Sequence, residues 1–163
     1  MYLTSILLTI LIFGSYLVYT FLRRDKKMFP VEAGPVDGVE RDFSKPISVC
    51  VGDLHMDKSL TYFVVQNDCM IPRHIYPNDV IGVQMFNDQF TVRDVKENDI
   101  LLIHLEDDDF KGHKIRVMKN IEGEAFHTYY FKNGYPKDSK KLHAFNTILG
   151  VVRETNHPQK MAA

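Results

Sequence analysis

The stretch TYFVVQNDCMIPRHIYPNDVIGV, residues 61–83, decides how the rest of the chain is interpreted. It holds two short runs rich in β-branched and aromatic residues, Thr61–Gln66 and a second run that begins at Val80, with turn residues between them. Such runs are typical of short β-strands. Between them stands a cysteine, Cys69, flanked by an aspartate and a methionine. A cysteine in this place is either a small buried hydrophobe or a nucleophile.

The same pattern continues outward from this stretch in both directions. Short apolar runs separated by turn residues follow one another from residue 47 to residue 153, without a long amphipathic helix. Closely spaced short strands predict a mostly β barrel or sandwich, with at most one helical turn near Met70–His74. The predicted strands are Ile47–Val51, Thr61–Gln66, Val80–Phe86, Ile100–Leu105, Lys114–Ile121, His127–Phe131 and Ile148–Arg153.

The dipeptide Asn-Asp occurs at 67–68, 78–79, 87–88 and 98–99. The second and fourth of these dipeptides directly precede predicted strands. Asparagine is one of the few residues besides glycine that tolerates a positive φ. We therefore expect these asparagines to occupy turn positions where glycine would serve equally well.

The N-terminal end of the chain differs in composition from the rest. Residues Tyr2–Leu22 carry no charge, and their length matches the roughly 20 residues that a helix needs to cross a bilayer. A cleavable signal peptide would need a basic start and a small-residue cleavage site, whereas here the basic cluster Arg23–Lys27 follows the apolar segment. The sequence therefore predicts an uncleaved single-pass anchor over residues 1–27 that contacts the bilayer through residues 2–22. The basic residues after it predict a cytoplasmic C-terminal domain.

Beyond the anchor, we expect a linker or extended arm over 28–48, a β domain over 49–155 and a tail over 156–163. Four of the 20 basic and one of the 21 acidic residues precede residue 28, so the remainder carries a net charge of −4. This charge disfavours a nucleic-acid partner. The two cysteines cannot form a disulfide framework, and Cys50 is expected in the core. The histidines lack metal-ligand spacing, so neither a metal nor a cofactor is expected.

With glycine in place of the asparagines, residues 60–153 resemble the LexA/UmuD autoproteases and the related type I signal peptidases. The segment Asn67-Asp68-Cys69-Met70 resembles the Gly-Asp-Ser-Met motif that carries the nucleophile, and Cys69-Met70-Ile71-Pro72 resembles the Ser-Met-x-Pro form of the signal peptidases. Val117–Ile121 resembles the Val-Lys-Arg-Ile segment that supplies a lysine base, and Gly150–Arg153 resembles the closing strand. The resemblance implies the β fold of this peptidase family behind one transmembrane helix.

The resemblance implies a nucleophile at Cys69 and a base at Lys119, with Lys114 as the alternative if the strand alignment slips. Such a lysine must be desolvated so that its ammonium form is disfavoured, and Lys119 has apolar neighbours in the sequence. Asn67 stands where signal peptidases carry a side-chain donor to the oxyanion. The family's serine is replaced by Cys69, which leaves two readings open. One is a working cysteine–lysine peptidase, and the other is a peptidase-like module without activity.

If the domain is active, the self-cleaving members of the family imply that it cuts its own arm before a glycine. We expect this cut at Ala33–Gly34, where it would free the β domain from its anchor; Met28-Phe29-Pro30 is also similar to the sequence after the UmuD cut. A signal-peptidase role, with another protein or peptide as substrate, would require the opposite membrane topology. The remaining alternative is an inactive structural or accessory subunit that binds a partner in a membrane protein complex.

Overall fold

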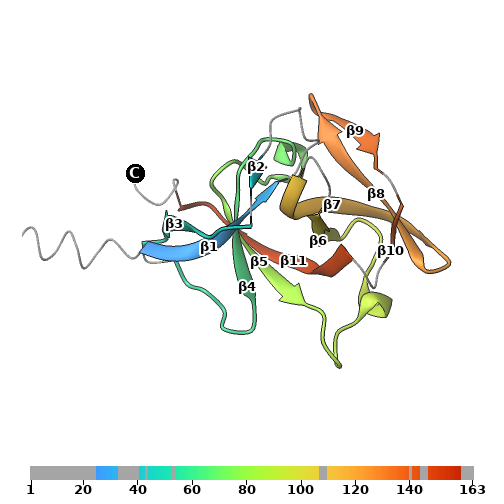
Figure 1. Cartoon of the computed structure of the whole chain (residues 1–163), viewed down its shortest axis with the longest axis horizontal. Coiled ribbons are helices and arrows are strands. Elements are labelled where there is room, and N and C mark those ends of the chain that lie inside the picture. The colour runs from blue at the N-terminus through green and yellow to red at the C-terminus, as the bar shows by residue number, and fades with distance from the viewer. Residues whose placement is uncertain are drawn as a thin grey trace, which may run out of the picture.

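The computed structural model describes residues 25–32, 41–42, 44–52, 54–106, 110–139, 141–143 and 147–158. Within these ranges the chain is mostly β, with two short 3₁₀ helices, η1 (Ile71–Arg73) and η2 (Val92–Asp94) (Figure 1). No helix in the described part is long and apolar enough to cross a membrane, and the predicted anchor lies outside that part. The strands are β1 (Asp25–Glu32), β2 (Arg41–Asp42), β3 (Ile47–Cys50), β4 (Thr61–Val65), β5 (Val80–Met85), β6 (Ile100–Glu106), β7 (Phe110–Glu122), β8 (Ala125–Lys132), β9 (Tyr135–Asp138), β10 (Leu142–His143) and β11 (Ile148–Asn156).

Six strands close into a barrel in the order β1-β4-β5-β11-β6-β7, and β7 pairs back to β1. β1 lies between β4 and β7 and runs parallel to both. The other four pairings of the barrel are antiparallel. Strands β8, β9 and β10 extend the sheet beyond β7, on the right of Figure 1. The predicted mostly β fold is therefore confirmed.

Each strand predicted from the sequence corresponds to an observed strand, and η1 corresponds to the predicted helical turn. The strand β1 was not predicted, because it lies mainly in the segment expected to be a linker or arm. Its first half, Asp25–Met28, pairs with β3, and its second half pairs with β4 and β7. The beginning of the arm is thus one of the six strands of the barrel.

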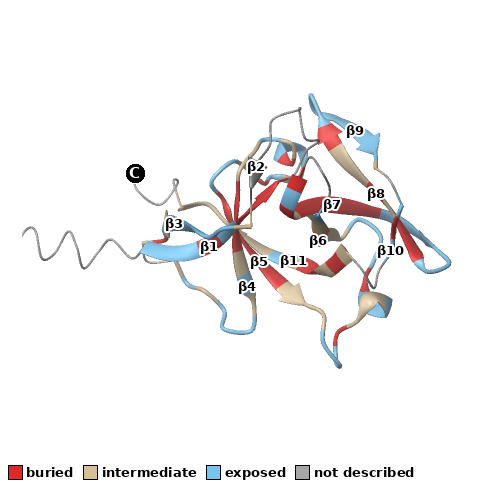
Figure 2. Ribbon diagram, viewed as in Figure 1, coloured by how far each residue is buried: buried red, intermediate tan, exposed pale blue. Residues whose placement is uncertain are grey.

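Apolar side chains fill the barrel and cover one of its outer faces. The cluster inside the barrel includes Val31 of β1, Val65 of β4 and Ile115 of β7, all with no exposed surface. A second cluster lies around β6, β7 and β11, where Phe126 of β8 and Leu142 of β10 complete it. Figure 2 shows the resulting concentration of buried residues along β7. β7 is therefore covered on both faces over much of its length.

The expectation for the turns is confirmed at two asparagines and wrong at two others. Asn78 and Asn98 both have φ = 69°, the conformation that glycine adopts freely. Asn67 and Asn87 do not have positive φ. Asn87 instead shapes its turn through its side chain, whose Oδ1 accepts hydrogen bonds from the N–H groups of Gln89 and Phe90 at 2.8 Å each.

Candidate functional site

Cys69 lies in the loop between β4 and η1, next to a residue that fixes this loop to the barrel. That residue is Met70, which has no exposed surface and whose carbonyl accepts the N–H groups of Arg73 at 2.8 Å and Ile75 at 3.2 Å. Cys69 itself is partly buried and packs against the cluster inside the barrel. The other cysteine, Cys50, is exposed on β3, so its predicted place in the core is wrong.

Lys119 does not have the buried environment that a lysine base requires. Its side chain is 54% exposed, and its Nζ donates to Oδ1 of Asp138 at 3.0 Å. The cause is a register shift between β7 and β8, where Met118 pairs with Thr128 and Asn120 pairs with His127. Such a bulge inserts one unpaired residue and ends the inward-outward alternation of the strand. The predicted desolvation of Lys119 is therefore wrong.

Lys114, the alternative base, lies earlier on the same strand and is buried. It is 5% exposed, and its Nζ lies 4.0 Å from the centre of the Phe110 ring. The Nζ also lies 4.0 Å from Oε2 of Glu32, the last residue of β1. Glu32 and Lys114 are register partners in the parallel pairing of β1 with β7. Lys114 thus has the desolvated environment that the sequence analysis expected for Lys119.

Arg116 is a second buried cation two residues further along β7, where the strand's alternation returns it to the same face as Lys114. It is 6% exposed, its Nη1 donates to the carbonyl of Ile115 at 2.9 Å, and its guanidinium lies 4.9 Å from the centre of the Tyr130 ring. With Glu32, which is 3% exposed, these residues form a buried charge cluster: Glu32, Lys114 and Arg116.

The electrostatics link this cluster to Cys69. Burial lowers the pKa of Arg116 to about 10, while the negative charges of Glu32, Tyr130 and Cys69 act in the opposite direction. Arg116 therefore remains a cation at neutral pH. The guanidinium of Arg116 is therefore close enough to Cys69 for the two groups to interact electrostatically.

Asn67 connects the loop that contains Cys69 with the end of β1. Its Nδ2 donates to Oε1 of Glu32 at 3.4 Å, and the neighbouring N–H of Gln66 donates to the carbonyl of Val31 at 3.0 Å. The predicted oxyanion donor is thus directed at the end of β1. The predicted cleavage bond, Ala33–Gly34, begins one residue beyond Glu32 and lies outside the described residues.

The site residues that sequence analysis missed are Glu32 and Arg116. Glu32 stands in a charged, proline-containing segment that reads as a linker, and no local signal marks it as buried. Arg116 does carry a signal, because it alternates with Ile115 and Val117 on a predicted strand and lies two residues from Lys114. An alternating pattern with charged residues on one face usually indicates a solvated face, whereas here Glu32 of β1 lies near Lys114 and Tyr130 of β8 lies against Arg116.

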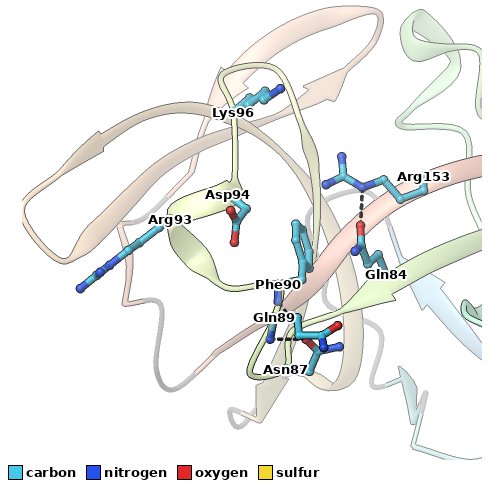
Figure 3. A pocket seen from close by; sticks show the side chains of 8 residues that line it. All are labelled: Gln84, Asn87, Gln89, Phe90, Arg93, Asp94, Lys96 and Arg153. Atoms are coloured by element: carbon cyan, nitrogen blue, oxygen red, sulfur yellow. Dashed lines mark hydrogen bonds between the residues drawn. The ribbon is translucent and has the colours of Figure 1, made fainter.

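One hollow on the surface contains none of the predicted site residues. It is lined by residues of β5, of the 87–96 loop and of β11 (Figure 3). Its Arg153 donates to Gln84 at 2.9 Å and lies 5.0 Å from the centre of the Phe90 ring, so its cation is already engaged. Within the described part of the chain, no group of three or more histidine, cysteine or acidic residues is arranged to hold a metal ion.

No protein family model matches the chain, and no curated protein matches its sequence significantly.

Proposed function

We propose that the chain is a LexA/signal-peptidase-like β domain on a membrane anchor, and that it acts as a cysteine peptidase on its own arm. The observation that carries the proposal is the path of β1. This strand runs parallel to β4, pairs Val31 with Val65, and ends with Glu32 against Asn67, two residues before Cys69. The Ala33–Gly34 bond follows directly in the sequence after this extended strand, and an extended strand is the form in which peptidases bind their substrates.

In the proposed reaction, Sγ of Cys69 attacks the carbonyl carbon of Ala33 as a thiolate, which Arg116 stabilises. The bond to the nitrogen of Gly34 breaks, and the ammonium of Lys114 gives its proton to the leaving amine. Water then hydrolyses the thioester, which returns the thiolate and leaves a carboxylate on Ala33; of the two protons released, one returns to Lys114 and the other passes to the freed amine of Gly34. In this scheme Lys119 takes no part in proton transfer, and Asn67 positions the arm through Glu32.

The location of β1 changes the expected outcome of the cut. A cut at Ala33–Gly34 leaves β1 on the anchor fragment, and β1 is held by β3, β4 and β7. Met28, Val31 and Glu32 are each at most 3% exposed. Cleavage therefore nicks the chain without by itself separating the domain from the anchor, contrary to the release expected from the sequence.

The proposal is tested by the intact mass of the full chain in detergent, followed for a day at pH 7 and at pH 9.5. We expect a fragment that begins at Gly34, and we expect it to be absent from Cys69→Ala and strongly reduced in Lys114→Met. Lys119→Ala is the matched control, because it changes an exposed lysine of the same strand, and it should cleave at the wild-type rate. An unchanged mass of the wild-type chain under both conditions would refute self-cleavage.

The alternative proposal is an inactive peptidase-like subunit of a membrane protein complex. One observation favours it: the carboxylate of Glu32 already lies against Lys114, and the arm forms an integral strand of the barrel. A buried ion pair that only stabilises the fold would show the same contacts. An uncut chain that co-purifies in fixed ratio with a membrane partner would support this alternative.

A further inference from the structure

The buried charge cluster holds two cations, Lys114 and Arg116, and the carboxylate of Glu32. Lys114 and Arg116 are both at least nine-tenths buried. Burying a cation is costly unless an anion and hydrogen bonds compensate it. Glu32 supplies this anion, with its Oε2 at 4.0 Å from Nζ of Lys114. Its negative charge also raises the pKa of Arg116 against the effect of burial. The surroundings of Lys114 and Arg116 at the end of β1 are therefore suited to a carboxylate.

The carboxylate arrives on a strand that the barrel holds in the manner of a bound peptide. β1 is flanked by β4 and β7, and the N–H of Gln66 donates to the carbonyl of Val31 at 3.0 Å. In strand addition, main-chain hydrogen bonds supply affinity for any extended chain, and side-chain pockets supply the specificity. Here the pocket at the end of the strand is the one that holds Glu32.

We propose that Lys114, Arg116 and Asn67 form a recognition pocket for one acidic side chain of an extended peptide, and that Glu32 of the chain's own arm is its resident ligand. The inference rests on the proposed function, because Glu32 immediately precedes the residue whose carbonyl is attacked. It adds the substrate class: an extended segment with an acidic residue two positions before the cut, directly before the residue whose carbonyl is attacked. A peptide with glutamine there loses the charge but keeps the shape.

The test uses the full chain in detergent with the Cys69→Ala substitution, so that self-cleavage plays no part in the result. A recognition sequence for an unrelated protease replaces part of residues 34–40, and that protease nicks the chain. The dissociation of the anchor fragment from the tagged β domain is then followed with time. We expect slow dissociation from the parent chain and dissociation about tenfold to a hundredfold faster from Glu32→Gln, as for the loss of a charged hydrogen-bonding group.

Glu122→Gln is the matched control, because Glu122 pairs with Lys141 at 2.6 Å on the exposed surface and should leave the dissociation rate unchanged. A second measurement needs no substitution in the pocket. The synthetic peptides MFPVEA and MFPVQA are added to the nicked parent chain, and only the acidic peptide should displace the anchor fragment. Equal displacement by both peptides, or equal dissociation rates of Glu32→Gln and Glu122→Gln, would overturn the proposal whether or not the domain cleaves itself.

Discussion

The substitution Glu32→Gln removes the only carboxylate of the buried charge cluster and leaves the rest of the site in place. At 4.0 Å, a unit charge pair with an effective dielectric constant of about 20 interacts by about 4 kcal/mol. Removing one partner of a buried pair typically costs about 3–5 kcal/mol, because the other charge stays buried and loses its opposite charge. Glutamine can retain the contact with Asn67, so we expect about 3 kcal/mol of lost unfolding free energy.

For a chain of this size, that loss corresponds to a fall in Tm of roughly 6–12 °C. The assay is thermal and urea unfolding of the full chain in detergent, followed by circular dichroism. The double variant Glu32→Gln/Lys114→Met should recover at least about 1 kcal/mol of the loss, since it also removes the buried ammonium that faced Glu32. A Glu32→Gln chain that melts within a degree of the wild type, or a double variant that is simply the sum of the single ones, would refute the reasoning.

Three further predictions concern the site, the pH dependence and the barrel. Arg116→Gln should slow alkylation of Cys69 by iodoacetamide at pH 7 by roughly tenfold, because the thiolate loses a neighbouring cation; an equal slowing in Lys119→Gln would contradict this. Burial, followed by a neighbouring histidine, lowers the pKa of His113 from 6.5, so the folded chain binds fewer protons than the unfolded chain just below that pH. Stability should therefore fall as the pH is lowered from about 7.5 to about 5.5, and His113→Phe should flatten this fall. Equal slopes of stability against pH in the wild type and in His113→Phe would refute this prediction. In Gly150→Ala the new methyl group would overlap the β5 backbone, so we expect about 3 kcal/mol of lost stability by urea unfolding, and an unchanged midpoint would contradict the strand pairing.

The sequence predicts much of the barrel because local chemistry and tertiary structure agree there. The runs Val80–Met85 and Ile100–Glu106 are rich in β-branched or aliphatic residues and become central strands. The turns before them need positive φ, which Asn78 and Asn98 supply. In these places a residue's own preference and its environment lead to the same structure.

The strand β1 could not be predicted, because its residues individually disfavour a central strand. Pro30 has no N–H for the ladder, and Asp25, Lys26 and Lys27 favour solvent. The strand exists because its second half fills the gap between β4 and β7 and completes the barrel. Only partners distant in the sequence reveal this, and the same holds for Glu32, whose burial depends on cations more than eighty residues away.

The nucleophile at Cys69 stays a prediction, whereas the predicted desolvation of Lys119 is wrong for a related reason. The resemblance and the apolar neighbours in the sequence predicted a desolvated Lys119, and the bulge after Met118 leaves its side chain at the surface. Bulges depend on cross-strand register, which a single strand's sequence does not determine. Lys114 and Arg116 precede the bulge, so their alternation is regular and their side chains lie on one buried face.

The central claim is that the arm enters the barrel as β1 and ends against the loop that carries Cys69. Hydrogen–deuterium exchange on the full chain in detergent tests this claim most directly, because it reports opening of individual strands. We predict that the amides of Phe29, Val31 and Glu32 exchange as slowly as those of Phe63 and Val65 on β4. Exchange of these β1 amides at the rate of an open linker, while β4 stays protected, would contradict the claim.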